Sequence, residues 1–407
     1  MRTAGRRALL VENIHPGAAD VLRAAGFEVE SVTKALDEHE LLDVLPEVDL
    51  IGIRSRTQLT EKVLDAAADR LMAVGAFCIG TNQIDLAAAT ARGVAVFNAP
   101  FSNTRSVVEL VIAEIIALTR RLTVKDDLMH AGVWDKSADG AHEVRGRRLG
   151  IVGYGNIGTQ LSVLAEAIGM SVAFYDTADR LALGNARRCT SLAELLETSD
   201  VVSLHVDGRP DNAGMFGDDE FARMKPGALF LNLSRGFVVD HAALADRVRS
   251  GRLAGAALDV FAAEPAGRDD PFESELRGLP NVILTPHIGG STEEAQADIG
   301  QFVAAKLAEY ATAGSTGLSV NLPRIGELPP AEGQERRHVL AHLHRNVPGV
   351  LAAINGIFGE HGVNIEGQSL ATRGDVGYVL TDVACECGGE VTDQLRAMPE
   401  TIRLRVL

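Results

Sequence analysis

The feature that most constrains the fold of this chain is a glycine-rich turn that follows a short apolar run. Residues 149–153 read LGIVG, which is β-prone, and Gly153, Gly155 and Gly158 have the spacing G-x-G-x-x-G. Gly153 permits a tight turn, Gly155 lets the backbone approach a pyrophosphate, and Gly158 lets the following helix pack on the strand. The free N–H groups and the positive dipole end of that helix would face the phosphates. The sequence therefore predicts a dinucleotide site at this turn.

A carboxylate ends the next predicted strand. The run SVAFYD finishes at Asp176, where an acidic side chain accepts hydrogen bonds from the adenosine ribose and would repel the 2′-phosphate of NADP. The sequence thus favours NAD as the cofactor. The alternative is a glycine turn without a ligand, but the order strand, glycine loop, helix, strand and acid favours the dinucleotide site.

Length and charge limit the classes of function. At 407 residues the chain exceeds one ordinary core, so two or three domains are expected. The composition, 46% hydrophobic and 23% charged, is that of an ordinary globular protein. A net charge of -16 argues against an extended nucleic-acid surface, which needs clustered Lys and Arg. An anionic substrate must therefore be bound by local cations.

The sequence shows no signal for a metal, a membrane or secretion. Only Cys385 and Cys387 lie close together among the four cysteines, and no C-x-x-C pair occurs, so no metal site is expected. The N-terminus lacks the apolar core of a signal peptide, and the most apolar window, residues 107–118, is too short to span a bilayer. A cytoplasmic protein without membrane partners is expected.

Strands and helices alternate in two successive units. Residues 6–100 contain five predicted strands separated by helices, which indicates a parallel sheet of the flavodoxin-like type. From residue 149 the pattern restarts and gives six strands, the number expected of a Rossmann-type sheet. One helix from Thr104 to Met129 is predicted between the units, and a helix from Ala295 to Tyr310 is expected to return to the first. We therefore expect a substrate-binding domain at 1–103 and 292–320 and an NAD-binding domain at 104–291.

A third unit is expected at the C-terminus. Residues 321–336 concentrate proline, glycine and charge, which is typical of a linker. Residues 337–407 then show the order βαββαβ of the ferredoxin-like fold. Because about seventy residues is a small domain, we expect it to pair edge to edge with a second copy.

Three candidate catalytic residues each follow a predicted strand of the second unit. Arg235 closes ALFLNLSRG, Glu264 follows GAALDVFAAEP, and His287 closes NVILTPHIGG. Because ligands bind at the carboxyl ends of strands in a doubly wound sheet, the three side chains could converge on one nicotinamide. Histidine suits the base that oxidation of a secondary alcohol needs. Glu264 would orient the imidazole and raise its pKa, and Arg235 would bind a substrate carboxylate.

Each of these residues also has a structural interpretation. A single histidine after a strand commonly caps or packs, Glu264 could be a solvated loop charge, and Arg235 could form a surface ion pair. Their common location downstream of a dinucleotide fingerprint favours the catalytic interpretation for all three together.

Several blocks of sequence carry a family resemblance. LGIVGYGNIGTQL, LNLSRGFVVD, GAALDVFAAEP and LTPHIGGST resemble the signature blocks of the D-isomer-specific 2-hydroxyacid dehydrogenases. The runs IRSRTQLTEKVLDAA, VFNAPFSNTRSVVELVI and HLHRNVPGVL resemble the branch of that family that acts on 3-phospho-D-glycerate and ends in an ACT domain. The resemblance extends over nearly the whole chain.

The resemblance implies roles for individual residues. Arg235, Glu264 and His287 would be the catalytic set. The residues that would contact NAD are Gly153, Gly155, Asn156, Ile157, Gly158, Asp176, Leu233, Ser234, Arg235, Asp259, His287, Ile288, Gly289 and Gly290. The positions that would surround the substrate carboxylate or phosphate are Arg54, Arg56, Asn103 and Arg105. Two arginines at i and i+2 of a strand end point the same way, which fits an anion site, although surface ion pairs are the alternative.

The tail resembles an ACT domain that binds L-serine at a dimer interface. The matching positions are His344, Asn346 and Asn364, and the asparagines supply the donors and acceptors that a zwitterion requires. The alternative is that these asparagines only cap or turn the chain. Two positions depart from the family pattern: Asp207 places an acid near the cofactor, and Val347 replaces a basic or polar residue.

The activity implied by the resemblance is NAD-dependent oxidation of 3-phospho-D-glycerate to 3-phosphohydroxypyruvate, with feedback by L-serine and a homotetrameric assembly. Reduction of 2-oxoglutarate would be a side activity, since 2-oxoglutarate resembles the substrate carboxylates. One alternative is a related dehydrogenase acting on glyoxylate or hydroxypyruvate. Another is an NAD-sensing corepressor, which has the same nucleotide fold and a similar triad.

Overall fold

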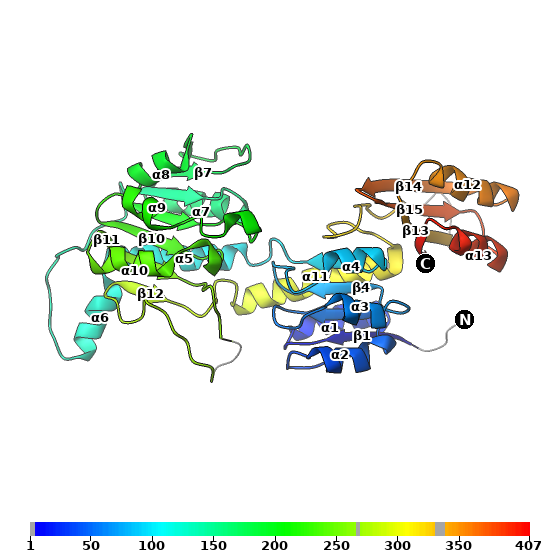
Figure 1. The fold of residues 1–407 in the computed structure, drawn as a ribbon, viewed down its shortest axis with the longest axis horizontal. Helices are drawn as coiled ribbons and strands as arrows, with labels where there is room; N and C mark the ends of the chain where they lie inside the picture. Colours follow the sequence, from blue (N-terminus) through cyan, green and yellow to red (C-terminus); the bar gives the residue numbers. More distant parts are fainter. Residues whose placement is uncertain (1–4, 266–268, 330–337) are drawn as a thin grey trace. The chain divides into compact units, whose positions relative to one another are not determined.

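The structure is a computed structural model that describes residues 5–265, 269–329 and 338–407. It divides into two compact units, residues 1–100 with 296–407 and residues 101–295 (Figure 1).

The first unit contains a five-stranded parallel sheet in the order β2-β1-β3-β4-β5. This is the flavodoxin-like order that the alternating sequence pattern predicted. The strands are β1 (Arg6–Leu10), β2 (Phe27–Ser31), β3 (Leu50–Ile53), β4 (Ala73–Ala76) and β5 (Ala95–Asn98). The helices between them are α1 (Pro16–Ala24), α2 (Glu38–Val44), α3 (Glu61–Ala66) and α4 (Leu86–Ala91). Because β1 and β3 are neighbours, the loops that follow them share one edge of the sheet.

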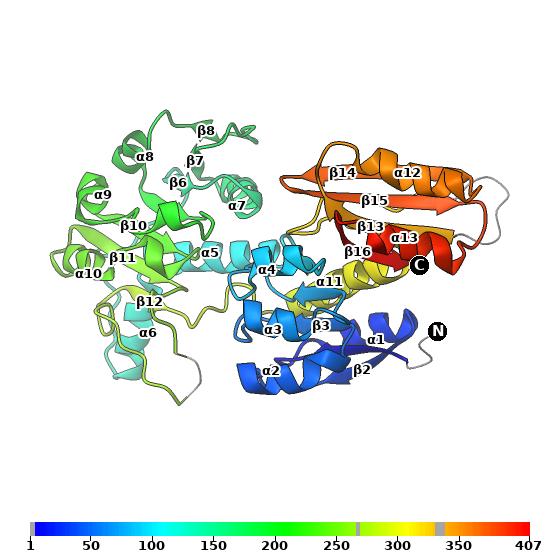
Figure 2. The same ribbon diagram turned by 45° about the vertical axis from the view of Figure 1, so that its right-hand side comes forward.

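Two later segments complete the core of the first unit. Helix α11 (Glu293–Ala313) lies beside the sheet in both views, and its Val303 and Leu307 are buried with Phe97 of β5 (Figures 1 and 2). Residues of the predicted linker at 321–336 also join this core, since Leu322 and Ile325 are buried there. Residues 321–328 therefore pack as part of the first unit, which their proline and glycine content did not indicate. Residues 330–336 lie outside the described part of the chain.

The second unit contains a parallel sheet in the order β12-β11-β10-β9-β6-β7-β8, which is the Rossmann order with one further strand. The strands are β6 (Arg148–Val152), β7 (Ser171–Tyr175), β8 (Arg187–Arg188), β9 (Val201–Leu204), β10 (Ala228–Asn232), β11 (Leu253–Leu258) and β12 (Val282–Leu284). The helices that follow β6 are α7 (Asn156–Ala167), α8 (Leu192–Thr198), α9 (Asp218–Arg223) and α10 (His241–Arg249). The loops after β10, β11 and β12 are neighbours at one edge because these strands pair in parallel.

The single helix predicted from Thr104 to Met129 is wrong. The chain forms α5 (Thr104–Thr119) and α6 (Leu122–His130), separated by Arg121 in a left-handed conformation with φ 52°. The sequence there, TRRLT, has neither glycine nor proline, so no local signal indicated the break.

The C-terminal region has the predicted βαββαβ order. Its elements are β13 (His338–Arg345), α12 (Val350–Glu360), β14 (Ile365–Arg373), β15 (Val376–Val383), α13 (Gly389–Ala397) and β16 (Thr401–Val406). They form an antiparallel sheet in the order β14-β15-β13-β16 (Figure 2). Leu340 packs on α12 and α13, whereas Ala341 and Leu343 are buried in the core of the first unit. Alternate residues of β13 thus face opposite sides, as strand geometry requires.

Candidate active site

The glycine turn after β6 has the geometry of a dinucleotide cradle. Gly153 has φ 92°, and a Cβ there would lie 2.5 Å from the backbone oxygen of His205. A Cβ at Gly158 would lie 2.3 Å from the backbone oxygen of Gly153, so only glycine lets α7 pack this closely on β6. No atom lies within 4 Å of the Cβ position of Gly155. The turn therefore needs two of its glycines for packing and keeps open space at the third, which fits a pyrophosphate.

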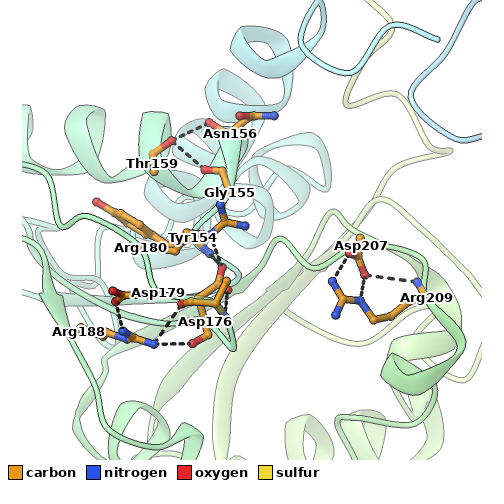
Figure 3. A network of polar contacts seen from close by, with 11 residues as sticks. Tyr154, Gly155, Asn156, Thr159, Asp176, Asp179, Arg180, Arg188, Asp207 and Arg209 are labelled. Carbon is orange, nitrogen blue, oxygen red and sulfur yellow. Dashed lines mark hydrogen bonds and ion pairs between the residues drawn. The ribbon is translucent and has the colours of Figure 1, made fainter. Parts of the chain in front are cut away.

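Asp176 lies beside this turn, at the end of β7 (Figure 3). Its Oδ2 accepts the backbone N–H of Tyr154 at 2.8 Å, and Oδ1 accepts that of Ala178 at 2.8 Å. A carboxylate has about four acceptor positions, so Asp176 retains capacity for ribose hydroxyls. A cavity of about 270 Å³ adjoins the turn and is lined by Tyr154, Gly155, Asn156, Thr159, Arg180, Leu181 and Leu183.

Asp207 is compensated by a neighbouring cation. The Nε and Nη2 atoms of Arg209 donate to its two carboxylate oxygens at 2.7 and 2.6 Å (Figure 3). This hydrogen-bonded pair lowers the pKa of Asp207. The acid that departs from the family pattern is therefore held in a local ion pair and does not present an unpaired charge to a cofactor phosphate.

Two of the three predicted catalytic residues are in direct contact. Nδ1 of His287 lies 2.9 Å from Oε2 and 3.1 Å from Oε1 of Glu264. The hydrogen bond to Glu264 raises the pKa of His287, although burial acts in the opposite direction. Burial is the largest single effect on Glu264 and acts to raise its pKa, but the hydrogen bond and charge of His287, the backbone N–H of Phe261 and the charge of Arg235 together outweigh it, so that pKa is lowered. The imidazole side chain remains 51% exposed, so a substrate can reach it.

Arg235 follows β10 at the same edge of the sheet. Its charge acts on both partners, since it lowers the pKa of Glu264 and opposes protonation of His287. Buried Asn232 shapes the turn that carries it: Oδ1 of Asn232 accepts the backbone N–H of Ser234 at 3.0 Å, and Nδ2 donates to the backbone oxygen of Arg235 at 3.0 Å. The structure thus brings Arg235, Glu264 and His287 together. Sequence analysis missed Asn232, although its place two residues before Ser234 is a typical turn signal.

Asp259 organises the turn that carries His287. One carboxylate oxygen accepts the side chain of Thr285 at 2.6 Å and the backbone N–H of Ile288 at 2.8 Å, and the other accepts the backbone N–H of Gly289 at 2.8 Å. The histidine has a left-handed backbone, with φ 55°. Such a conformation is costly for a non-glycine residue and persists where surrounding bonds enforce it. The family resemblance placed Asp259 among the residues that would contact NAD, but the sequence did not indicate that it fixes this turn.

The contact between His287 and Glu264 predicts a shifted pH profile in a Glu264→Gln variant. Losing the carboxylate lowers the pKa of His287. Neutral imidazole is the base in alcohol oxidation, so kcat/KM rises as pH rises through that pKa, and in the variant this rise moves to lower pH. We expect kcat to fall about tenfold or more, because the imidazolium that forms loses its partner. Profiles of kcat and kcat/KM against pH, recorded in both reaction directions between about pH 5 and about pH 10, measure this effect. If kcat/KM of the variant rises at the same pH as that of the wild type, the predicted role of Glu264 is contradicted.

Glu114 of α5 gives a second pH-dependent prediction. Its side chain is 3% exposed, both oxygens lack a partner among the described residues, and burial together with nearby Asp259 raises its pKa to about 8. Between pH 4.5, the ordinary pKa of a glutamate, and about pH 8 the unfolded chain releases this proton while the folded chain keeps it. The free energy of unfolding therefore falls as pH rises through that window, by on the order of 5 kcal/mol.

A Glu114→Gln variant is expected to remove this dependence. Thermal unfolding midpoints of variant and wild type should be similar near about pH 5 and should favour the variant near about pH 9. Glu109→Gln is a matched control on the same helix, because Glu109 is 59% exposed and ion-paired with Arg105. A variant that differs from wild type equally at both pH values would refute the assignment.

The four predicted substrate residues differ in their surroundings. Arg54 and Arg56 follow β3, and within the described residues neither guanidinium makes a hydrogen bond or ion pair. Arg105 instead donates from Nε to Glu109 at 2.5 Å on α5, the surface pairing considered as its alternative. Asn103 packs against the His287 turn, because a Cβ at Gly290 would lie 2.4 Å from its Nδ2.

The three predicted effector residues occupy two ends of the C-terminal sheet. His344 is buried, with Nδ1 2.9 Å from the backbone oxygen of Arg345. Asn346 lies at the β14–β15 hairpin, where its Nδ2 donates to the backbone oxygen of Gly374 at 3.1 Å. Asn364 precedes β14, at the other end of that strand, where its backbone oxygen accepts the backbone N–H of Ala384.

Comparisons with known proteins agree with this geometry. Residues 112–289 match the family model "D-isomer specific 2-hydroxyacid dehydrogenase, NAD binding domain", and residues 340–403 match "AHAS small subunit-like ACT domain". The chain is 51% identical to D-3-phosphoglycerate dehydrogenase of Escherichia coli K12 over 98% of its own length and 97% of that protein. The chain belongs to the D-isomer specific 2-hydroxyacid dehydrogenase family. It is an oxidoreductase of this family, and its cofactor is NAD.

Other relatives give the same assignment. D-3-phosphoglycerate dehydrogenase of Dictyostelium discoideum is 47% identical over 98% of this chain and 96% of its own length. Among solved structures, D-lactate dehydrogenase from Aquifex aeolicus, complexed with NAD and lactic acid, matches with a TM-score of 0.68 and 28% identity, covering 78% of this chain and 99% of that one. Within the described residues, no helix is long and apolar enough to cross a bilayer, and no cluster of three or more His, Cys, Asp or Glu side chains could hold a metal ion.

Proposed function

We propose that this chain oxidises 3-phospho-D-glycerate to 3-phosphohydroxypyruvate with NAD. The observation that carries the proposal is the contact of 2.9 Å between His287 and Glu264. It occurs in a chain that is similar to D-3-phosphoglycerate dehydrogenases over nearly its whole length. The open space at Gly155 and the remaining acceptor capacity of Asp176 fit the pyrophosphate and ribose of NAD.

The residues of the site supply a base and a cationic side chain that binds the substrate carboxylate. With its Nδ1 proton held by Glu264, His287 has Nε2 available to take the proton of the substrate hydroxyl. Glu264 stabilises the imidazolium that results. Arg235 binds the carboxylate with two N–H donors and polarises the adjacent carbonyl in the reverse direction. When bound, NAD would supply the acceptor for the hydride that leaves the carbon bearing the substrate hydroxyl.

Arg54 and Arg56 are proposed to bind an anionic group of the substrate. A chain of net charge -16 repels a phosphorylated acid over most of its surface, so two arginines that have no anionic partner among the described residues are suited to attract it.

A steady-state assay tests the proposed activity. The reduction of 3-phosphohydroxypyruvate, hydroxypyruvate, glyoxylate and 2-oxoglutarate is followed with NADH. We expect the highest kcat/KM for 3-phosphohydroxypyruvate and a lower one for 2-oxoglutarate, which lacks the phosphate. A preference for glyoxylate or hydroxypyruvate would assign a related dehydrogenase instead, and no turnover of any acid would favour the corepressor-like function. The proposed compartment is the cytoplasm, which four free cysteines support.

We further propose that L-serine binds between the C-terminal domains of two copies. Asn346 lies beside the β14–β15 hairpin and Asn364 at the opposite end of β14, a strand of nine residues. A strand of this length separates its ends by roughly 25 Å or more. One copy therefore cannot place both asparagines on one amino acid, whereas two copies joined edge to edge can.

Mixed subunits test this arrangement. Asn346→Ala and Asn364→Ala homo-oligomers should each lose inhibition by serine. Mixing the two variants after reversible dissociation should restore part of the inhibition, because one shared site of each mixed pair then carries both asparagines. Failure of the mixture to respond, with wild type responding, would exclude a shared site.

A further inference from the structure

A buried carboxylate outside the catalytic set holds the loop that follows β3. Glu12 is 6% exposed. Its Oε1 accepts the backbone N–H of Arg54 at 3.1 Å and of Thr57 at 2.8 Å, and its Oε2 accepts the backbone N–H of Arg56 at 3.1 Å. Three N–H groups of one loop thus converge on a side chain 42 to 45 residues earlier in the sequence. Bonds of backbone N–H groups to a buried carboxylate are among the stronger hydrogen bonds in proteins.

The backbone that presents this carboxylate is strained. Glu12 and Asn13 both have left-handed conformations, with φ 64° and 54°. The N–H of Glu12 donates to the backbone oxygen of Lys34 at 3.0 Å, which holds the turn after β1 in this state. Two consecutive non-glycine residues in this region are costly, and such strain persists mainly where a site requires a fixed geometry.

The same loop is held from a second side. Buried Gln83 donates from Nε2 to the backbone oxygen of Arg54 at 2.7 Å. Thr57 is 1% exposed, and its Oγ1 accepts the backbone N–H of Leu36 at 3.4 Å. The backbone of the loop is therefore fixed on both sides, although the guanidinium groups of Arg54 and Arg56 have no protein partner among the described residues.

These contacts also limit how the loop can bind an anion. Successive backbone N–H groups can form an anion-binding nest, but here the N–H groups of Arg54, Arg56 and Thr57 are already occupied by Glu12. An anionic ligand at this loop must be bound by the side chains. The bonds to Glu12 thus leave recognition of the anion to the two guanidinium groups. They also fix the backbone positions from which these two side chains extend.

We propose that Glu12 is a positioning residue that fixes Arg54 and Arg56 to bind an anionic group of the substrate. This inference rests on the proposed function, because it assumes that the two arginines contact the substrate. Glu12 itself touches neither substrate nor cofactor.

Replacing Glu12 with Gln in the full chain tests the proposal. Glutamine retains one acceptor oxygen and turns an NH₂ group toward N–H donors, so at least one loop N–H loses its partner. We expect KM for 3-phosphohydroxypyruvate to rise tenfold or more, about 1.4 kcal/mol or more of binding. The kcat and the dissociation constant of NADH should stay within about twofold of wild type. A KM within twofold of wild type overturns the proposal.

Asp49→Asn is the matched control. Asp49 precedes β3 at the other end of that strand, where its Oδ2 accepts the backbone N–H of Arg7 at 2.7 Å and binds Arg70 at 3.0 Å. This variant removes a comparable carboxylate from the same sheet. It should lower the unfolding midpoint and leave KM unchanged, so an equal rise of KM in both variants overturns the proposal as a general effect of weakened folding.

Glu12→Asp decides the question if Glu12→Gln does not fold. The shorter side chain keeps the charge but cannot reach all three N–H groups, so KM should rise at least threefold, and an unchanged KM overturns the proposal. Turnover of 3-phosphohydroxypyruvate by the wild type tests the proposed function independently. The ratio of variant to wild-type KM tests Glu12 alone.

Discussion

His287→Ala is expected to lower kcat by about 100-fold or more while leaving the dissociation constant of NADH nearly unchanged. Removal of a positioned general base costs on the order of 10²–10⁴ in rate. The cradle at Gly153 to Gly158 follows another strand, so NADH binding should survive the substitution. Steady-state turnover and fluorescence titration with NADH measure the two quantities.

Two further measurements make this result specific. His142→Ala is a control, because His142 is an exposed histidine of the same unit and lies outside the site. Added imidazole should restore part of the activity of His287→Ala, since the side chain that is removed is half exposed. Turnover within a few-fold of wild type in His287→Ala would exclude this residue as the base.

Gly158→Ala is expected to destabilise the fold of the second unit strongly. The added Cβ would lie 2.3 Å from the backbone oxygen of Gly153 and 3.0 Å from Cγ2 of Ile151, so α7 must move away from β6. Such overpacking against backbone costs about 2–4 kcal/mol. The unfolding midpoint should fall by several degrees, and NADH binding should weaken at least about 100-fold because the turn loses its shape.

Gly155→Ala separates ligand contact from packing in the same motif. No atom lies within 4 Å of its Cβ position, and its φ of -83° suits any residue. Stability should therefore stay within about 0.5 kcal/mol of wild type, while the methyl group occupies space meant for the pyrophosphate and weakens NADH binding about tenfold or more. Wild-type affinity for NADH in this variant would show that the cofactor does not approach Gly155.

The fold was predictable from the sequence where local chemistry and periodicity agree. Five continuous apolar strands before residue 100 indicated a parallel sheet, and the observed strand order is that of the flavodoxin-like fold. The glycine spacing located the cradle because each glycine meets a separate steric requirement. Likewise, Arg235, Glu264 and His287 follow β10, β11 and β12, which pair in parallel, so their placement at successive strand ends was enough to bring them together.

What the sequence could not indicate depends on contacts between distant segments. Glu12 reads as an ordinary acid after a strand, and its bonds to Arg54 and Thr57 require knowledge of which strands are neighbours. Leu322 and Ile325 lie in a stretch whose composition is that of a linker, yet the core of the first unit accepts them. The break at Arg121 has no local signal, because a left-handed arginine is imposed by its surroundings.

The packing of the C-terminal sheet limits how this region could be moved to another protein. One of its faces is completed by its own helices, but Ala341, Leu343 and Leu380 belong to the core of the first unit, and Tyr378 donates to the backbone oxygen of Gly314 at 2.7 Å. Cutting the chain before β13 would expose apolar surface on both fragments, which favours aggregation. An engineer who grafts this domain onto another enzyme would have to transplant part of α11 with it or redesign that face.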